Sequence, residues 1–486
     1  MEIDYIKSDT APLYESLTGS KKRMELLWGD SVRVLSNSGA RRKVKARGIE
    51  GYVKPDDLGG ESLLEVYFID VGQGDGVLIR TPDNRHIMID GGYNRAKQPT
   101  GKNAADFVDW KFYRDYGKRK IKLDAMVASH CDADHYGGLW DLLNPDETEE
   151  LDASEVEVDQ FYHAGVSWWK KPGGGRYLGP ETNGFLTQLL HNRASVGAAL
   201  QSSGPGLKLQ GEWAQFMRVV YDHGCPITRL THATDYLPGF EPADGRVSIR
   251  ILGPVEYIDG GNPVFRSLRS KSQNTNGHSI LLRLDFGRSR ILLTGDLNKK
   301  SQQLLLDEYE GERHEFMCDV AKGCHHGSDD ISFEFLQAMG AAATVISSGD
   351  NEGHAHPRPN IVSASAITGH VQIQNDELLT PLIYSTEISR SINVGKPTKL
   401  TLDNWVDENG DELEINDLSA VKVAYNVVKA GDLRPTKRSR TLSSRLIVDG
   451  IVYGLVNVRT NGDRILCAVL NEKKNEWEYQ TFTSRF

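Results

Sequence analysis

The chain has 486 residues, of which 39% are hydrophobic and 26% carry a charge. Such a composition is typical of a globular protein with a sizeable core and excludes a fibrous or largely disordered chain. The 57 Lys and Arg residues are outnumbered by 67 Asp and Glu residues, which gives a formal net charge of −10. Because non-specific nucleic-acid binding depends on Lys and Arg displacing counterions from phosphates, a protein that coats nucleic acid is disfavoured.

The expected cellular location follows from what the sequence lacks. The acidic N-terminal segment contains Pro12 and does not have the charged and then apolar pattern of a signal peptide. No apolar run approaches the roughly 18 residues that span a bilayer. The five cysteines form no C-x-x-C pair, which disfavours a disulfide framework or a zinc ribbon. We expect a cytoplasmic protein with reduced cysteines and no membrane partner.

The first 60 residues predict a small β module, because alternating apolar positions are separated by Gly and Asp at turn positions. Strands are expected within residues 24–35, 41–48 and 49–60. The segment resembles a bacterial SH3-like module, and the residues that carry this resemblance are Trp28-Gly29-Asp30, Val32, Val34, Val44, Ala46 and Gly51-Tyr52-Val53. A β-rich extension packed on the main domain is the alternative interpretation of the same pattern.

From Leu64 onward, apolar strands alternate with amphipathic helices. Strands are expected at residues 64–71, 76–81, 86–90, 124–129, 247–252, 279–285, 290–296 and 343–348. Helices are expected at residues 139–143, 299–310 and 332–339. The alternation predicts an α/β fold in which helices cover buried sheets.

Helix signals become rare near the C-terminus, and residues 393–486 are predicted to form a small antiparallel β domain. Asp449-Gly450 and Asn461-Gly462 are expected to be hairpin turns within it.

A long insertion is predicted over residues 151–244. It contains Trp168-Trp169-Lys170-Lys171-Pro172, followed by Gly173-Gly174-Gly175-Arg176-Tyr177. Aromatic residues interleaved with bases are typical of a single-stranded nucleic-acid groove and also of a mobile lid over an active site. The lid is the favoured interpretation.

The segment SHCDADHYGG, residues 129–138, directly follows an expected strand. Within six residues it holds four potential metal ligands, His130, Asp132, Asp134 and His135. One loop can therefore supply two neighbouring ions, with His130 and Asp132 at one and Asp134 and His135 at the other. A surface loop rich in helix-capping Asp is the alternative.

Three further groups stand where a metal site needs distant ligands. Asp296 ends an apolar strand, where an unpaired charge is costly without a cation, so it is a candidate to bridge two ions. His325-His326 and His354-Ala355-His356 are expected at the ends of other strands. Several such groups at strand ends favour a metal site over isolated structural histidines.

The order of the motifs resembles that of the metallo-β-lactamase superfamily: Asp90-Gly91-Gly92, SHCDADH, Thr294-Gly295-Asp296 and His325-His326-Gly327-Ser328. The resemblance implies an αββα sandwich over residues 61–392. Within the superfamily, the chain resembles the metal domain of ComEC-type competence proteins. This narrower resemblance is carried by FIDVGQGDGVLI at residues 68–79, by Asp132 in place of the usual second His, and by KGCHHGS and GHAHP.

The resemblance implies a ligand set for two divalent ions, Zn²⁺ or Mn²⁺. It comprises His130, Asp132, Asp134, His135, Asp296 and one of His325 and His326. Where the competence-type pattern has Asn-x-x-Ser, this chain has Asn276-Gly277-His278-Ser279, so His278 is either a further ligand or a substrate contact. Asp75 and Asp90 are expected to support the metal loops from below.

Two adjacent ions suit phosphodiester hydrolysis, because they activate water and clamp the oxygens of an in-line displacement. Asp134 is expected to orient the attacking water, while His354, His356 or Lys322 neutralises phosphate charge or protonates the leaving oxygen. A nuclease or nucleotide phosphodiesterase is therefore predicted, with a nucleic acid or nucleotide as substrate and with protein partners for the flanking β modules as a further expectation. A phosphorylcholine esterase, another ester hydrolase and a catalytically silent binding protein are the alternatives.

Overall fold

The computed structural model describes residues 3–37, 39–98, 103–144, 151–349, 356–386, 393–395, 397–407, 410–427, 436–444, 447–449, 455–471 and 476–486. The chain divides into two compact units, one made of Met1–Ser389 with Tyr453–Phe486 and the other of Arg390–Val452. Within the described ranges, every helix is too short or too polar to cross a bilayer.

The N-terminal module is a six-stranded antiparallel sheet with the order β1-β4-β5-β6-β2-β3. Its strands are β1 (Ile3–Tyr5), β2 (Thr10–Tyr14), β3 (Lys22–Leu27), β4 (Ser31–Ser36), β5 (Arg42–Ala46) and β6 (Ile49–Val53). Alternate residues face a small core that includes Leu13, Leu26, Val32, Val44 and Val53. The strands predicted for this segment are confirmed, whereas its SH3-like character stays a prediction.

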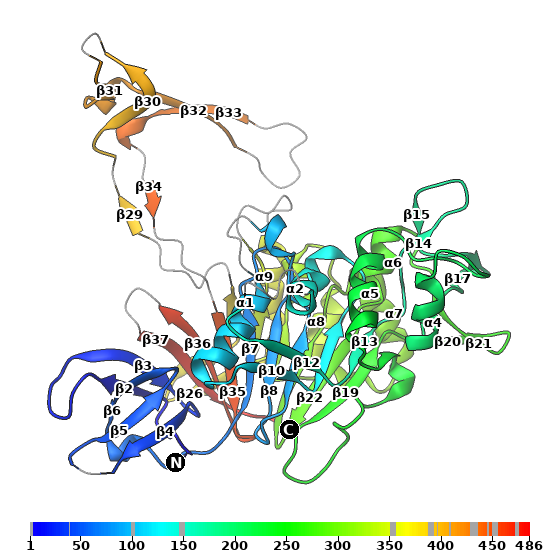
Figure 1. Ribbon diagram of the computed structural model, residues 1–486, viewed down its shortest axis with the longest axis horizontal. Coiled ribbons are helices and arrows are strands. Elements are labelled where there is room, and N and C mark those ends of the chain that lie inside the picture. The colour runs from blue at the N-terminus through cyan, green and yellow to red at the C-terminus, as the bar shows by residue number, and fades with distance from the viewer. Residues whose placement is uncertain are drawn as a thin grey trace. The chain divides into compact units, whose positions relative to one another are not determined.

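Two larger sheets form the centre of the first unit (Figure 1). The nine-stranded sheet contains, in spatial order, β18 (Ile227–Arg229), β13 (Phe161–His163), β11 (Ala125–Ala128), β9 (His86–Ile89), β8 (Val77–Arg80), β7 (Leu64–Ile69), β35 (Leu455–Thr460), β36 (Arg464–Asn471) and β37 (Glu476–Thr483). The six-stranded sheet contains β19 (Ser248–Gly253), β22 (Leu281–Phe286), β23 (Ser289–Leu293), β24 (Val320–Lys322), β25 (Ala343–Ile346) and β28 (Leu382–Ser385).

Helices cover the outer faces of both sheets. On the nine-stranded sheet lie α1 (Ala104–Trp110), α2 (Ala133–Leu143) and α5 (Glu212–His223), and on the six-stranded sheet lie α7 (Lys299–Glu308), α8 (Phe333–Met339) and α9 (Pro359–Thr368). A third apolar cluster, including Phe68, Val127, Leu282 and Ile291, fills the space between the sheets. The predicted αββα arrangement is therefore confirmed, because each sheet buries both of its faces.

The C-terminal strands differ from the expected separate β domain over 393–486. Strand β35 pairs antiparallel with β7, and β36 and β37 continue the same sheet. Val456 and Val458 are fully buried between the two sheets, which fixes this hairpin as part of the main domain. The turn at Asn461-Gly462 joins β35 to β36 as predicted, with Gly462 at φ 99°.

The second unit contains three antiparallel strand pairs in its described part. They are β29 (Asn393–Gly395) with β34 (Ile447–Asp449), β30 (Leu400–Val406) with β31 (Glu412–Ile415), and β32 (Lys422–Val427) with β33 (Thr436–Thr441). The antiparallel β character predicted after residue 392 is present in this unit. The turn predicted at Asp449-Gly450 extends beyond the described residues.

Buried ion pairs join the N-terminal module to the large sheet. The Arg459 side chain on β35 is fully buried, and its Nη2 lies 2.8 Å from Asp30 Oδ1 of the module. Arg47 Nη2 approaches the other oxygen of Asp30 at 2.7 Å. Arg459 also lies 3.9 Å from Glu65 on β7, which pairs with Arg80 at 2.6 Å. The module is therefore held against the large sheet by charges that water does not screen.

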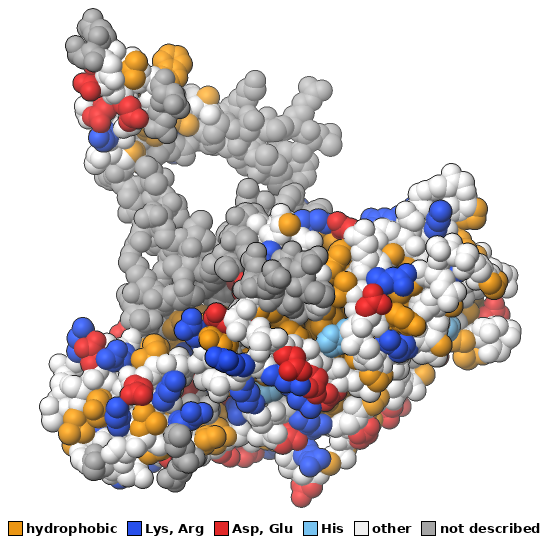
Figure 2. All heavy atoms as spheres, in the orientation of Figure 1, with side chains coloured by type: hydrophobic (Ala, Val, Ile, Leu, Met, Phe, Trp, Pro, Cys, Tyr) orange, Lys and Arg blue, Asp and Glu red, His pale blue; other side chains and the backbone are white. Residues whose placement is uncertain are grey.

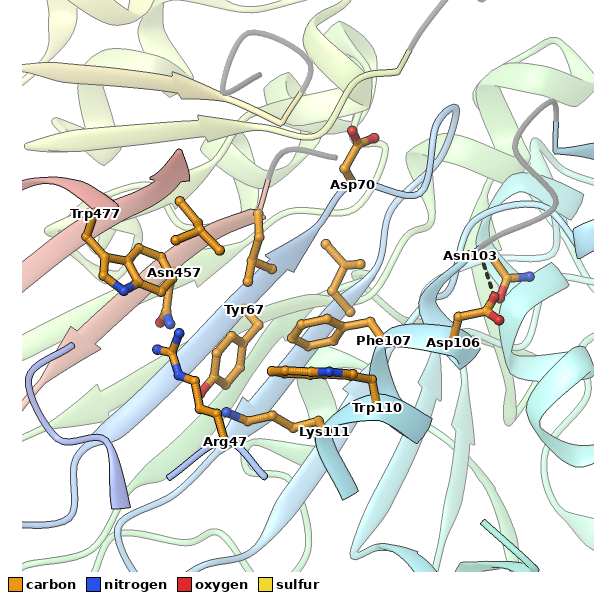
Figure 3. Close-up of a pocket in the computed structure, with 13 residues that line it drawn as sticks. Arg47, Tyr67, Asp70, Asn103, Asp106, Phe107, Trp110, Lys111, Asn457 and Trp477 are labelled. Atoms are coloured by element: carbon orange, nitrogen blue, oxygen red, sulfur yellow. Dashed lines mark hydrogen bonds between the residues drawn. The ribbon is translucent and has the colours of Figure 1, made fainter. Parts of the chain in front are cut away.

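An apolar cavity of about 310 Å³ lies where the module, α1 and the sheet meet (Figure 3). Tyr67, Phe107 and Trp110 form its aromatic wall, and Asp70 lies at the opposite end from Arg47. No member of the clustered His and Asp residues described below lines it.

Parts of the predicted insertion, residues 151–244, belong to the nine-stranded sheet and to the core, unlike a mobile lid. Its strands β13 and β18 are parallel members of the nine-stranded sheet. Trp168 and Trp169 are 7% and 1% exposed and belong to the core beneath α5, so they are not free to stack on bases. Residues 170–176, in the short hairpin of β14 (Trp169–Lys170) and β15 (Arg176–Tyr177), are exposed, as are residues 180–184, 201–206 and 241–246.

Candidate metal centre

The candidate site gathers loops from the ends of strands in both sheets. Residues 129–135 follow β11, Asp90 follows β9, Asp296 follows β23, and His325 and His326 follow β24. Asp75 comes from the loop between β7 and β8. The folded sandwich thus brings together residues that are up to 251 positions apart in the sequence.

Backbone contacts hold these loops close. Gly74, at φ 116°, packs against the turn that begins α2, where an added Cβ would lie 1.9 Å from the Asp134 carbonyl oxygen. A side chain cannot be accommodated there without moving the loop. The backbone N–H of Ser129 donates to Asp90 Oδ1 at 2.7 Å, and the N–H of Gly91 donates to the His135 carbonyl at 2.7 Å.

Asp296 lies at the centre of the cluster. Its Oδ2 is 3.2 Å from His135 Nε2 and 2.9 Å from His326 Nε2. His130, His135 and Asp296 form one group whose potential ligand atoms lie within 4.8 Å of each other, and Asp134, His135 and His326 form another. Both groups include His135, but its Nδ1 contacts Asp90, so the remaining Nε2 can bind only one of two neighbouring ions.

Two buried carboxylates fix the orientation of the histidines. Asp90 Oδ2 lies 2.8 Å from His135 Nδ1, and Asp75 Oδ1 lies 3.3 Å from His326 Nδ1. In both cases the Nε2 atom is turned toward Asp296. Asp90 accepts a hydrogen bond from His135 Nδ1, which sets the tautomer and leaves Nε2 for a metal, whereas Asp75 and His326 form a close ion-pair contact.

The electrostatics of the cluster balance acids against imidazoles. Burial disfavours charge on the ring, yet the carboxylates of Asp296 and Asp75 raise the pKa of His326 to about 10. Burial and the neighbouring His135 lower the pKa of His130 to about 3. Burial also opposes charge on His135, but Asp296 and Asp90 raise its pKa, so the acids of the cluster favour positive charge at these ring nitrogens, as a bound divalent ion would supply.

The donor atoms fit divalent ions. His130 Nε2, His135 Nε2, His326 Nε2 and Asp296 Oδ1 are buried and, despite their short separations, make no hydrogen bond of acceptable geometry. Buried polar atoms normally have such partners, so these unpartnered atoms are suited to bind cations. The set consists of imidazoles and carboxylates without a thiolate, which suits Zn²⁺ or Mn²⁺.

The structure distinguishes the two neighbouring histidines. His326 takes part in two of the clusters, whereas no cluster among the described residues contains His325. His325 Nε2 lies 3.1 Å from Asn276 Nδ2 and 3.8 Å from Asp296. Both histidines have positive φ angles, 48° and 52°, a strained backbone that directs the two rings differently.

Asp132 and Asp134 lie at the more open side of the cluster. Asp132 is the N-cap residue of α2 but makes no capping hydrogen bond, so its carboxylate is not used in the way that the structural alternative requires. It lies 3.9 Å from His130 Nε2 and 30% of its side chain is exposed. Asp134 accepts a hydrogen bond from Gln73 at 3.2 Å, and no expectation from the sequence had included Gln73.

His278 lies outside the cluster. Its position agrees with neither of its two predicted roles, metal ligand or substrate contact. Its Nε2 donates to the Arg266 carbonyl at 3.0 Å, and its ring stacks on Phe265 with centroids 4.9 Å apart. Burial lowers its pKa to about 4. The side chain is a neutral part of the core beside α6 (Lys271–Gly277).

Lys322 also lies elsewhere than expected. Its ammonium group is 2% exposed, contacts Asp75 at 2.6 Å and donates to the Gly295 carbonyl at 2.8 Å. It therefore supports the cluster from below instead of facing a substrate. His356 is half-buried, with its ring 6.1 Å from that of His325, whereas His354 lies outside the described residues.

A family model described as the metallo-beta-lactamase superfamily matches residues 69–345, more than half of the chain. The chain therefore belongs to the metallo-beta-lactamase superfamily. The motif order and the αββα layers agree with this assignment.

Two curated relatives have competence-related names. The chain is 22% identical over 307 residues to ComE operon protein 3 of Bacillus subtilis (strain 168), a match that covers 61% of this chain and 30% of the relative. It is 27% identical over 332 residues to competence protein ComA of Neisseria gonorrhoeae, covering 67% of this chain and 31% of the relative. The chain thus matches about a third of the length of each of these relatives.

Proposed function

We propose that this superfamily hydrolase is a phosphodiesterase or nuclease that acts on DNA, RNA or nucleotides with two divalent ions. The observation that supports this most directly is the position of Asp296 between His135 and His326, with two ligand groups on its sides. The choice of a phosphodiester substrate rests on the resemblance to competence-type metal domains.

Different residues of the cluster would bind the two ions. His130, His135 and Asp296 would hold one ion, and Asp134 and His326 would complete the second site. When bound, two such ions lower the pKa of water and neutralise charge on the phosphate oxygens.

Asp134 would also orient the attacking water, because it belongs to a ligand group and 15% of its side chain is exposed. His356, beside His325 at the outer edge, would contact the phosphate or protonate the leaving oxygen. For His354 the same proposal rests on its place in the GHAHP motif.

The test is hydrolysis of a substrate panel by chelator-treated protein reloaded with Zn²⁺ or Mn²⁺. The panel contains linear and circular DNA, RNA, cyclic dinucleotides, bis-p-nitrophenyl phosphate, p-nitrophenyl phosphorylcholine and a carboxylic ester. Metal-dependent cleavage of phosphodiesters is expected, with two ions per chain by elemental analysis. Exclusive cleavage of phosphorylcholine or carboxylic esters would favour the other metallohydrolase, and no metal uptake would favour a binding protein.

A further inference from the structure

A tryptophan of the insertion connects the metal loop to an exposed cation. The indole N–H of Trp168 donates to the carbonyl oxygen of Cys131, between His130 and Asp132, at 3.2 Å. The guanidinium of Arg176 lies over the Trp168 ring, 4.2 Å from its centroid, in a cation–π contact. Arg176 is itself exposed, so its charge is held beside the metal loop and remains accessible to solvent.

Further cations continue outward from Arg176. The Lys271 ammonium group donates to the Arg176 carbonyl at 3.1 Å, and Lys170 is the cross-strand partner of Arg176 in the β14–β15 hairpin. The backbone N–H of Lys170 donates to the Lys208 carbonyl at 2.7 Å. Lys170, Lys208 and Arg218 line a cavity of about 670 Å³ beside α4 (Arg193–Leu200) and α5. These five residues, Lys271, Arg176, Lys170, Lys208 and Arg218, are here named the cationic track.

No carboxylate among the described residues forms an ion pair with the cationic track. Lys208 and Arg218 donate instead to the backbone carbonyls of Ala198 and Leu200. Figure 2 shows Lys and Arg side chains at the β14–β15 hairpin. In a chain of net charge −10, adjacent cations without acidic partners provide a local positive potential for an external anion.

Two lysines elsewhere on the surface have acidic partners. On β10 (Lys120–Leu123), Lys120 contacts Glu155 at 2.8 Å and Lys122 contacts Glu157 at 3.2 Å, both on β12 (Glu155–Val158). Red and blue side chains accordingly alternate over these strands in Figure 2. The difference between the two regions makes β10 a matched control.

We propose that the cationic track binds the sugar–phosphate backbone of an extended nucleic acid on one side of the bond that is cleaved. This inference rests on the proposed function and assigns it a substrate-binding surface. Contacts with phosphates position a strand without reading its sequence, so binding should be sequence-independent. Stacking of bases on Trp168 and Trp169 is not part of the proposal, because both rings are buried.

The test compares metal-loaded wild type with the triple variant Lys170→Ala, Arg176→Ala, Lys208→Ala. Fluorescence anisotropy with a labelled single-stranded 20-nucleotide probe gives Kd over a series of salt concentrations. Each lost phosphate contact should reduce the slope of log K against log salt by about 0.7, so the triple variant should lose about 2 from that slope. Its affinity at low salt should fall at least about tenfold, and Arg176→Lys should retain most of it.

Two controls keep the result specific. The variant Lys120→Ala, Lys122→Ala removes charges that already have partners and should leave Kd and slope unchanged. Hydrolysis of bis-p-nitrophenyl phosphate, which is too small to reach the track, should fall much less in the triple variant than oligonucleotide affinity does. An unchanged oligonucleotide Kd and slope in the triple variant would overturn the proposal. So would a loss of activity on bis-p-nitrophenyl phosphate as large as the loss of oligonucleotide affinity.

The binding titration separates this inference from the proposed function, because it requires no turnover. Wild type that binds the oligonucleotide through the track but cleaves no phosphodiester would refute the function and retain the binding surface. Wild type that cleaves bis-p-nitrophenyl phosphate but does not bind the oligonucleotide would refute the surface and retain the function.

Discussion

At the scale of single residues, the site depends on which atoms of each side chain are left without a protein partner. Asp134 and Cys131 are neighbours in the same loop but face different surroundings. The Asp134 carboxylate lies 3.8 Å from His326 Nε2, whereas the Cys131 side chain is buried in the core beneath α2. Burial raises the pKa of the Cys131 thiol well above its usual value, so it is not a thiolate nucleophile at neutral pH.

We therefore expect Asp134→Ala to lower phosphodiester turnover by several orders of magnitude, because it removes both a ligand and the group that orients water. Cys131→Ala should lower turnover less than about threefold. Steady-state kinetics on bis-p-nitrophenyl phosphate, with circular dichroism to check folding, measures both effects. The opposite ranking would indicate thiol chemistry and refute the metal assignment.

Asp90 acts through another residue, and its replacement tests that indirect role. Asp90→Asn weakens the acceptor for His135 Nδ1 and should weaken metal binding about 10- to 100-fold while leaving the stoichiometry at two ions. Titration against a chromophoric chelator measures this affinity. Asp330→Asn, at an exposed site near the same cluster, is the control. Unchanged affinity in Asp90→Asn would mean that the buried carboxylate does not tune the site.

At the scale of elements, strand ends carry the candidate ligands, and the residues between them keep the strands and helices in place. His278, at the C-terminal end of α6, illustrates the second role. It connects this helix to β21 (Asn262–Arg266) through the Arg266 carbonyl and the ring of Phe265.

His278→Ala should lower the free energy of unfolding by about 2 kcal/mol, because it leaves a cavity and removes the hydrogen bond to the Arg266 carbonyl. Metal content should stay at two ions per chain. Urea denaturation and elemental analysis measure the two quantities, with the exposed His314→Ala as control. Loss of one ion would show that His278 is a ligand after all.

At the scale of the whole molecule, buried charges join the N-terminal module to the large sheet. This arrangement predicts that the free energy of unfolding depends on pH. Although burial alone would raise it, Arg459 and Arg80 lower the pKa of Glu65 to about 2, from an ordinary 4.5. A group with a lowered pKa in the folded state stabilises that state above its unfolded pKa. This contribution, about 3 kcal/mol, is lost as the pH falls from about 4.5 through about 2.

Glu65→Gln should therefore be less stable than wild type at pH 7, and the difference in unfolding free energy should shrink as the pH falls toward 2. Denaturant unfolding at several pH values measures this difference. The exposed Glu334→Gln provides the control. A difference that is independent of pH would show that Glu65 is not charged in the folded protein.

Much of the centre was predictable from the sequence, because ligands on one short loop are recognisable by residue type and spacing alone. Asp134 and the strand-terminal Asp296 lie in the His and Asp clusters as expected, whereas no cluster among the described residues contains Asp132, and the strands before these residues occur where the apolar runs predict them. Local patterns also predicted β11, β23 and the turn at Asn461-Gly462.

Only the tertiary structure shows which of the candidate site residues lie close together. His278 and His326 have the same chemistry and similar neighbours in the sequence, but only His326 meets Asp296, because strand packing and a positive φ direct its ring there. The sequence around Trp168 is typical of a base-stacking residue, but packing buries the ring. The sequence of β35 predicts part of a separate domain, but the strand pairs with β7. Residue type and local period determine the strands and the loop ligands. Contacts between distant segments depend on sheet order, which no local pattern contains.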